Sequence, residues 1–187
     1  NAATNSPLPV NRINCISVDP QNRVWVGTDF GIGLFDGIGW TIYNRNNSGL
    51  TAEIINDFAF DNIGNTWIAT SANFVKFDGM TWTIYRDPND SFWITSIYIE
   101  SENNIWLGTV ADGIINFVNG NHIKLLQPEY GYPSKTISSI SVDNFNNIWF
   151  CFLPDTAGRG GISYWDGVGF NNYFLGTPQI NIKETAF

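Results

Sequence analysis

The stretch RVWVGTDFGIGLFDGIGWTIY, residues 23–43, decides the fold, because related stretches return three more times along the chain. Each copy is marked by a tryptophan, and successive tryptophans are spaced by 42, 39 and 43 residues: Trp25, Trp67, Trp106 and Trp149. An acidic residue stands six positions before each of them: Asp19, Asp61, Glu100 and Asp143. This constant offset predicts one turn of fixed length before each tryptophan.

Each unit contains four short apolar or alternating runs separated by Gly, Asn and Asp. After the tryptophan come GLFDG, VKFDG, NFVNG and SYWDG, followed by WTIY, WTIY, HIKLL and FNNYF. Such runs predict four antiparallel strands per unit and no helix. Repeats of about 42 residues that each form a four-stranded sheet predict an all-β β-propeller. We expect blades over residues 11–45, 53–87, 93–127 and 135–175.

Blade packing explains the mixture of tryptophan and glycine. The middle strands are apolar on both faces, as in Val24-Trp25-Val26, which is typical of a sheet covered on both sides. We expect each tryptophan to fill the gap between blades and to contribute roughly 3 kcal/mol by burial. A second repeated position, directly before an apolar residue, is Gly in three units and Asn in one. Because Gly and Asn are the residues that most readily adopt a left-handed backbone, this predicts a conformational role and not a phosphate site. Its residues are Gly31, Asn73, Gly113 and Gly161.

Composition narrows the class of protein. The chain has 187 residues, of which 43% are hydrophobic and 16% aromatic, so it can build a packed core. A net charge of -8 argues against binding to nucleic acid or to an anionic membrane surface, and we find no apolar run that would span a bilayer. Cys15 and Cys151 lie in strand-like apolar runs, which favours buried thiols over a disulfide.

Over residues 13–174 the chain resembles the two-component regulator propeller repeat. The resemblance rests on D-x-x-x-N-x-W-x-G-T, then Gly-Ile, then F-D-G, then Trp or Phe with Tyr three residues later. The resemblance implies a sensor region outside the cytoplasmic membrane of bacterial hybrid sensor kinases, many of which respond to breakdown products of complex carbohydrates. It therefore implies a periplasmic or extracellular location. The third and fourth units depart from the pattern, with NFVNG for FDG, HIKLL for WTIY and the insertion LPDTAGRG.

The last eight residues, INIKETAF at 180–187, resemble IINDFAF before Asp61. This predicts the first strand of a fifth blade. We therefore expect an open arc from a larger propeller, whose end blades would have apolar faces covered by further blades or by self-association.

Catalytic chemistry has few candidates in this sequence. His122 is the single histidine and replaces the first residue of an outermost WTIY strand, which favours an edge position over a ligand or base. Antibiotic-inactivating lyases with a similar Trp-containing repeat use histidine chemistry, so one histidine in this place weighs against that activity. The repeated carboxylates lie on different blades, whereas glycoside hydrolysis needs a close pair, so turn capping is the better interpretation. Asp36, Asp78 and Asp166 before glycine predict hairpins.

Metal binding is also disfavoured. No His/Cys cluster suits zinc. Ile63 and Phe145 occupy the position where an EF-hand loop needs a calcium ligand. The loops NRNNSG and RDPNDS stay candidates for weak ion binding. We predict a chain without enzyme activity, metal or cofactor.

A ligand would bind where loops join the second and third strands and where one blade leads to the next. Aromatic side chains with flanking Asp and Arg suit sugars, because sugar rings stack on aromatic faces and their hydroxyls need donors and acceptors. The candidate residues on these loops are Asp29, Phe30, Trp93, Tyr130, Tyr132, Asp155 and Arg159. Two functions stay open: a sensory module that binds a carbohydrate-derived ligand, and a structural or protein-interaction scaffold.

Overall fold

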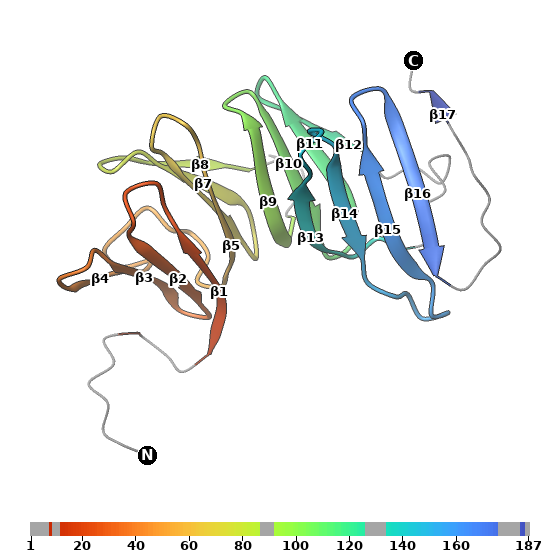
Figure 1. The fold of residues 1–187 in the computed structure, drawn as a ribbon. Helices are drawn as coiled ribbons and strands as arrows, with labels where there is room; N and C mark the ends of the chain where they lie inside the picture. The colour runs from red at the N-terminus through yellow and green to blue at the C-terminus, as the bar shows by residue number, and fades with distance from the viewer. Residues whose placement is uncertain (1–7, 9–11, 87–91, 126–133, 176–183, 186–187) are drawn as a thin grey trace. The chain divides into compact units, whose positions relative to one another are not determined.

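A computed structural model describes residues 8, 12–86, 92–125, 134–175 and 184–185. Contacts divide the chain into two compact units, Asn1–Ser91 and Phe92–Phe187. The described residues form four antiparallel sheets, each made of strands that follow one another along the chain (Figure 1). The predicted all-β class and the four repeated meanders are therefore confirmed. The described part of the chain contains no helix long and apolar enough to cross a membrane.

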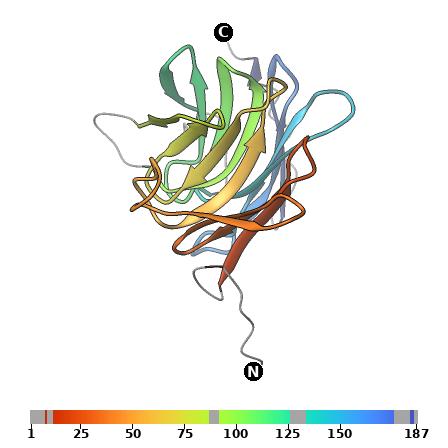
Figure 2. The same ribbon diagram turned by 90° about the vertical axis from the view of Figure 1, so that its left-hand side faces the viewer.

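The first unit holds two sheets of four strands, which contact each other through β1, β2 and β5 (Figure 2). We call them blade 1 and blade 2. The strands of blade 1 are β1 (Ile13–Val18), β2 (Val24–Thr28), β3 (Gly31–Phe35) and β4 (Trp40–Tyr43). Those of blade 2 are β5 (Ile55–Phe60), β6 (Thr66–Thr70), β7 (Phe74–Phe77) and β8 (Trp82–Tyr85).

The second unit holds blade 3 and blade 4. Blade 3 consists of β9 (Ile94–Ser101), β10 (Asn104–Thr109), β11 (Ile114–Val118) and β12 (Asn121–Lys124). Blade 4 consists of β13 (Ile137–Val142), β14 (Ile148–Phe152), β15 (Gly160–Trp165) and β16 (Gly169–Leu175), with a short fifth strand β17 (Glu184–Thr185).

Strand β17 bears on the expected fifth blade. It pairs antiparallel with the first residues of β16, Gly169 and Phe170, and so extends the sheet of blade 4. The other residues of 180–187 lie outside the described part of the chain. The assignment of this segment to a fifth blade stays a prediction.

Trp25 fills the space between blades 1 and 2, as the pattern predicted. It is fully buried, and its ring lies 5.8 Å from that of Phe58, 6.2 Å from that of Phe60 and 6.4 Å from that of Phe77. In the second unit Trp106 occupies the equivalent place, with its ring 5.6 Å from that of Phe150. Tilted aromatic contacts of this kind add to the free energy gained from burial.

A small residue next to each of these tryptophans lets the blades approach. A Cβ built on Gly27 would contact Cys15 Sγ within its own blade and would lie 2.8 Å from Ile55 Cγ2 of blade 2. A Cβ on Gly108 would lie 2.6 Å from Ile137 Cγ2 of blade 4. The glycine of the W-x-G-T motif is therefore a packing requirement between neighbouring sheets.

The second repeated glycine position behaves differently from the expectation. Gly31 and Gly113 have positive φ angles of 118° and 72°, as predicted. Asn73 and Gly161 are not among the described residues with positive φ, so the left-handed expectation is wrong at these two positions. Asn73 serves instead through its side chain, whose Nδ2 donates to Thr51 Oγ1 at 2.7 Å.

Candidate functional site

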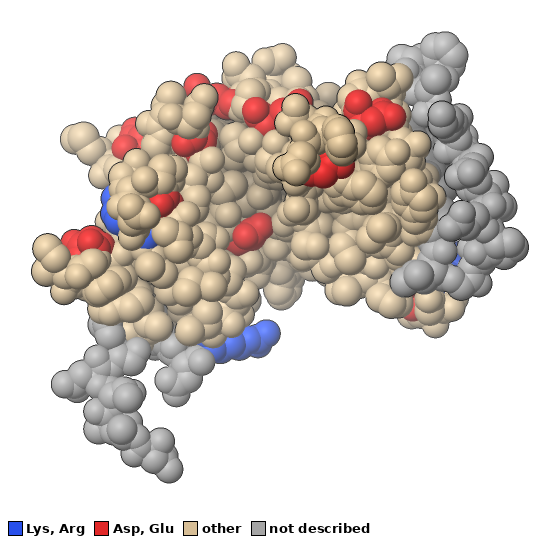
Figure 3. Space-filling model, in the orientation of Figure 1, with Lys and Arg blue, Asp and Glu red and all other residues tan. Residues whose placement is uncertain are grey.

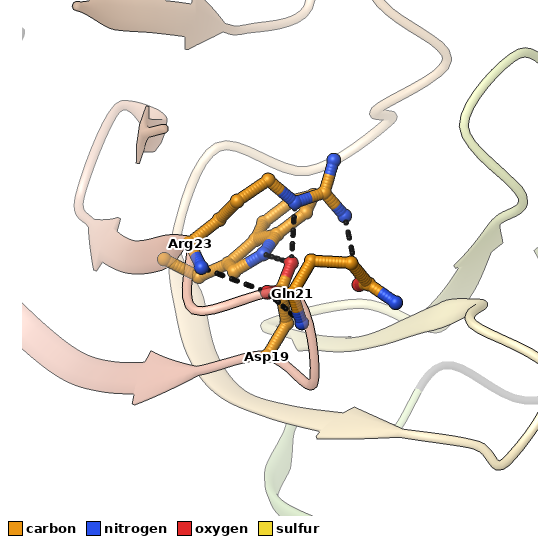
Figure 4. A network of polar contacts seen from close by, with 4 residues as sticks. Asp19, Gln21 and Arg23 are labelled. Atoms are coloured by element: carbon orange, nitrogen blue, oxygen red, sulfur yellow. Dashed lines mark hydrogen bonds and ion pairs between the residues drawn. The ribbon is translucent and has the colours of Figure 1, made fainter. Parts of the chain in front are cut away.

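The acidic residue before each repeated tryptophan organises a turn (Figure 4). In blade 1, Asp19 Oδ1 accepts the backbone N–H groups of Gln21 and Arg23 at 3.0 and 2.9 Å. Its Oδ2 accepts Arg23 Nε at 2.6 Å and the indole Nε1 of Trp25 at 2.9 Å. One carboxylate thus shapes the turn and satisfies the buried polar atom of the tryptophan.

The other three blades repeat this bond between acid and indole. Its length is 3.0 Å from Trp67 to Asp61, 2.9 Å from Trp106 to Glu100 and 2.9 Å from Trp149 to Asp143. An asparagine four positions after the acid donates to the same oxygen in each: Asn65, Asn104 and Asn147. Each acidic residue is thus engaged by its own blade, in agreement with the turn-capping interpretation.

These hydrogen bonds hold the carboxylates of Asp19, Asp61 and Asp143 ionised. Burial raises the pKa of Asp19 and of Asp61, but the bonds from Trp25 and Arg23, and from Trp67 and Asn65, outweigh burial and lower both values below the usual range. For Asp143, the bond from Trp149 is the largest influence and the pKa falls to about 2. Groups that are ionised and saturated with donors are poor proton shuttles near neutral pH.

The predicted ligand residues of the first unit lie at the turn between β2 and β3. Asp29 accepts a hydrogen bond from Asn14 Nδ2 at 2.9 Å and lies 3.5 Å from the guanidinium of Arg12. The side chain of Phe30 is 52% exposed, and its backbone N–H donates to Thr28 Oγ1 at 3.1 Å. Asp29 therefore helps to join this turn to the start of β1, while Phe30 is available to a ligand.

A hydrogen-bonded path joins the loops at the same end of the second unit. Val110 N donates to Trp93 O at 3.0 Å, Thr136 Oγ1 donates to Val110 O at 2.6 Å, and Leu153 N donates to Thr136 O at 2.9 Å. The path runs from the start of blade 3 through its β10–β11 turn to the start of blade 4 and the loop after β14. The structure therefore brings Trp93 to the same end of this unit as the insertion that holds Asp155 and Arg159.

This end of the second unit combines apolar and charged side chains. Trp93, Val110 and Leu153 are 47%, 37% and 46% exposed. Lys124 Nζ forms an ion pair with Asp112 at 3.0 Å. We call these five residues, together with Asp155 and Arg159, the loop-end surface of the second unit. It offers an exposed aromatic ring at the same end of the unit as charged donors and acceptors, a combination that suits an uncharged polar ligand such as a sugar.

The insertion of blade 4 copies the acidic turn of blade 1. Asp155 Oδ1 accepts the backbone N–H groups of Ala157 and Arg159, and Oδ2 accepts Arg159 Nε at 2.8 Å. The residue before the arginine has positive φ in both turns, 76° at Gly158 and 60° at Asn22. Arg159 therefore has a structural partner, although its side chain is 62% exposed.

Several features of the loop-end surface were not predicted from the sequence. Val110 and Thr136 are ordinary residues in the repeat, Leu153 is the first residue of the insertion, and no signal marks the hydrogen bonds that join their loops. Tyr130 and Tyr132, which the sequence analysis proposed as ligand residues, lie outside the described residues.

His122 lies in the outermost strand β12, as expected. Its ring is 4.9 Å from that of Phe117, opposite it on β11, and 5.7 Å from that of Phe92. Among the described residues, no group of three or more His, Cys, Asp or Glu side chains could hold a metal ion. His122 therefore packs as an aromatic side chain at a sheet edge.

Residues 7–30 match the family described as "Two component regulator propeller". The comparison with curated proteins gives no match.

Solved structures share the fold at low sequence identity. A protein described as the extracellular domain of one component system BT4673 from B. thetaiotaomicron superposes with a TM-score of 0.64 and 16% identity, covering 94% of this chain and 22% of that one. A streptogramin B lyase gives 0.71 and 18%, covering 92% and 57%. A catalytically inactive histidine-to-alanine variant of virginiamycin B lyase from Staphylococcus aureus, with quinupristin, gives 0.67 and 16%, covering 91% and 59%.

The chain spans 22% to 59% of the length of these three structures, so it corresponds to part of a larger propeller. The match over residues 7–30 agrees with the motif that the sequence analysis singled out. The chain is therefore a β-propeller chain that carries a two-component regulator propeller repeat.

Proposed function

We propose that this chain is part of an extracytoplasmic, non-catalytic sensory propeller of a bacterial two-component signalling protein, and that its ligand is derived from a carbohydrate. The family match over residues 7–30 is the observation that carries the signalling role. The extracellular domain with which the chain shares its fold supports the location. The loop-end surface supports a small polar ligand, because the 47% exposed Trp93 lies at the same end of the unit as two ion pairs, Lys124–Asp112 and Arg159–Asp155.

Calorimetric titration of the 187-residue chain with a panel of oligosaccharides tests this function. We expect saturable binding that Trp93→Ala weakens about fivefold or more, because loss of one stacking ring removes about 1 kcal/mol or more. Phe145→Ala is the matched control, since Phe145 is an aromatic side chain that is 85% exposed in a turn at the opposite end of its sheet. Arg159→Ala tests the insertion separately from the ring.

Binding that survives both Trp93→Ala and Arg159→Ala would move the ligand to another surface. No binding of any oligosaccharide by the folded chain would favour the second candidate, a scaffold for protein interaction. A specific observation supports that candidate: apolar residues on one face of blade 1 are uncovered, with Ile13, Ile16 and Val18 at 54%, 67% and 58% exposure.

A lyase activity is the third alternative, since two of the structures with this fold are lyases. The inactive variant of one of them lacks a histidine. Here the single histidine packs against Phe117 and Phe92 in an edge strand. We expect no turnover of quinupristin by this chain. Turnover that His122→Ala abolishes would overturn the non-catalytic assignment.

A further inference from the structure

The turns between the third and fourth strands of blades 1, 2 and 4 share the sequence Asp-Gly-apolar, and the apolar side chain is left in solvent. Its exposure is 95% for Ile38, 91% for Met80 and 64% for Val168. In blade 1, Asp36 Oδ1 accepts the N–H groups of Ile38 and Gly39 at 2.9 and 2.8 Å. The aspartate and glycine therefore set the turn, and the residue after them contributes only its backbone.

Blades 2 and 4 place a second exposed apolar residue at the same end. Ile63, between β5 and β6, is 71% exposed, and Phe145, between β13 and β14, is 85% exposed. Both turns of a blade lie at one end of its sheet, because Ile148 of β14 pairs with Trp165 of β15 there. Two strand spacings, roughly 10 Å, separate such turns. We call the pairs Ile63 with Met80, and Phe145 with Val168, the apolar tips of blades 2 and 4.

Ionised carboxylates stand beside these tips. Backbone N–H groups of the turn lower the pKa of Asp78 and of Asp166 below the usual value. Asp143 and Asp61 belong to the neighbouring turns and are also held ionised, as described above. On the face shown in Figure 3, acidic atoms are visible at the upper end of the blade 4 sheet, and no Lys or Arg atom is visible beside them. The residue paired with the repeated tryptophan on the neighbouring strand differs between the two blades. It is the cationic Lys76 in blade 2 and the uncharged Tyr164 in blade 4.

Blade 3 shows that the fold does not require apolar tips. Its turn between β11 and β12 is built from Asn119 and Gly120, with φ angles of 50° and 86°, and continues with the polar Asn121. In its other turn Glu102 occupies the place of Ile63. With Val118 paired to Asn121, this hairpin is two residues shorter than those of blades 1, 2 and 4, and it closes the same end of the sheet with polar residues. The apolar residues of blades 2 and 4 are therefore available for contact with another molecule.

We propose that each apolar tip, that of blade 2 and that of blade 4, is by itself a docking point for a segment of a partner protein in which cationic and apolar side chains alternate. Single exposed apolar residues are common on soluble proteins, but two in adjacent turns form a small contact surface. A lysine or arginine side chain of the segment would pair with Asp78 at the tip of blade 2 or with Asp166 at the tip of blade 4, which gives charge complementarity and faster association. An anionic lipid surface would be repelled by the same carboxylates. This inference goes beyond the proposed function and does not depend on the ligand.

The probe is a synthetic peptide of alternating lysine and leucine, titrated into the ¹⁵N-labelled 187-residue chain and followed by amide NMR shifts. We expect saturable shifts in residues 61–65 and 78–81 and in 143–147 and 166–169, with the turn of 119–121 unaffected. Phe145→Ser with Val168→Ser should weaken binding at blade 4 at least tenfold and leave blade 2 unchanged. Ile38→Ser removes the exposed apolar side chain from the equivalent turn of blade 1 and should leave binding at blades 2 and 4 unchanged.

Other outcomes overturn the proposal. A peptide of alternating glutamate and leucine that binds equally well would remove the role of the carboxylates. Shifts spread over the whole surface, or insensitivity to Phe145→Ser with Val168→Ser, would indicate unspecific attraction of the peptide to an acidic protein. Binding of phosphatidylcholine vesicles through the same residues would assign the tips to a lipid surface. A change of sedimentation coefficient in Phe145→Ser with Val168→Ser would assign them to self-association.

Discussion

The indole Nε1 of Trp25 donates a hydrogen bond of 2.9 Å to Oδ2 of Asp19, six residues earlier in the chain. The ring of Trp25 packs on blade 2, while Asp19 holds the turn between β1 and β2. The turn of one sheet and the interface with the next therefore depend on the same bond. The bond returns in every blade, and in blade 3 the bonded Trp106 likewise packs on the next blade. A defect in the carboxylate of blade 1 or blade 3 should therefore disturb both local hairpin geometry and packing between blades.

Asp61→Asn should lower the free energy of unfolding by about 1–3 kcal/mol, because the new amide N–H₂ would face two donors, Trp67 Nε1 and Asn65 Nδ2. Urea denaturation followed by circular dichroism measures the loss. In a Trp67→Phe background one of these donors is absent, so Asp61→Asn should cost less there. Equal costs in both backgrounds would show that the bond between acid and indole contributes nothing.

Gly27→Ala should destabilise the chain by about 1–3 kcal/mol, because the added methyl group meets Cys15 and Ile55 in a close-packed interface. Gly39→Ala is the matched control, since a Cβ at Gly39 has no atom within 4 Å. Thermal unfolding of both variants gives the comparison. A similar melting temperature for the two would mean that blades 1 and 2 do not pack as closely as this structure has them.

Asp143 should make stability depend on pH in a narrow acidic window. Its pKa is about 2 in the folded chain, against an ordinary value of 3.8. A lowered pKa stabilises the folded state above pH 4 and loses this effect as the pH falls toward 2. The gap in unfolding midpoint between the native chain and Asp143→Asn should therefore shrink from pH 5 to pH 2. A gap that stays constant over this range would contradict the pKa of this carboxyl.

The strand pattern was predictable because turn residues and the spacing of Trp25, Trp67, Trp106 and Trp149 report local structure directly. The bond between acid and indole was missed because a constant offset gives a distance along the chain and not the direction of a side chain. Asn73 was misjudged for a related reason: glycine and asparagine share a preference for positive φ, but here the asparagine is used for its side-chain amide.

The candidate site was predictable only in part. The order of the strands determines at which end of a sheet each loop lies, so the sequence alone could place Trp93, Asp155 and Arg159 at one end of the second unit. The bond from Thr136 Oγ1 to Val110 O could not be predicted, because it joins residues 26 positions apart in loops without a motif. The structural partner of Arg159 could have been found by comparing DTAGR with DPQNR, which share the acid and the arginine at the same spacing.

Cys15 should react slowly with alkylating reagents in the folded chain. Burial is the main cause that raises its pKa to about 12, and the nearby charge of Asp57 adds to it. Against an ordinary thiol pKa of 9.0, this leaves roughly a thousandfold less thiolate at pH 7.5. Iodoacetamide labelling of a Cys151→Ser chain, followed by mass spectrometry, isolates Cys15. Labelling as fast as in urea would show that Cys15 is accessible as a thiolate.

Equivalent positions in blades 1 and 2 should differ sharply in their contribution to stability. Ile16 and Phe58 occupy the same place in the first strand of their blades, opposite Val26 and Ile68, yet Ile16 is 67% exposed and Phe58 only 6%. Phe58→Ala should cost about 3–5 kcal/mol, as expected for a core aromatic residue. Ile16→Ala should change the free energy of unfolding by less than about 0.5 kcal/mol, as expected at an exposed site.

The two substitutions also report whether another surface covers blade 1. A second copy of the chain, or further blades of a longer one, would bury Ile16 much as blade 1 buries Phe58. In that case Ile16→Ala would become costly, and its cost would grow with protein concentration if a second copy were the cover. Chemical denaturation at two concentrations a hundredfold apart, with sedimentation velocity on the same samples, separates these outcomes. If Ile16→Ala changes the free energy of unfolding by less than about 0.5 kcal/mol at both concentrations, this face of the 187-residue chain is open in solution.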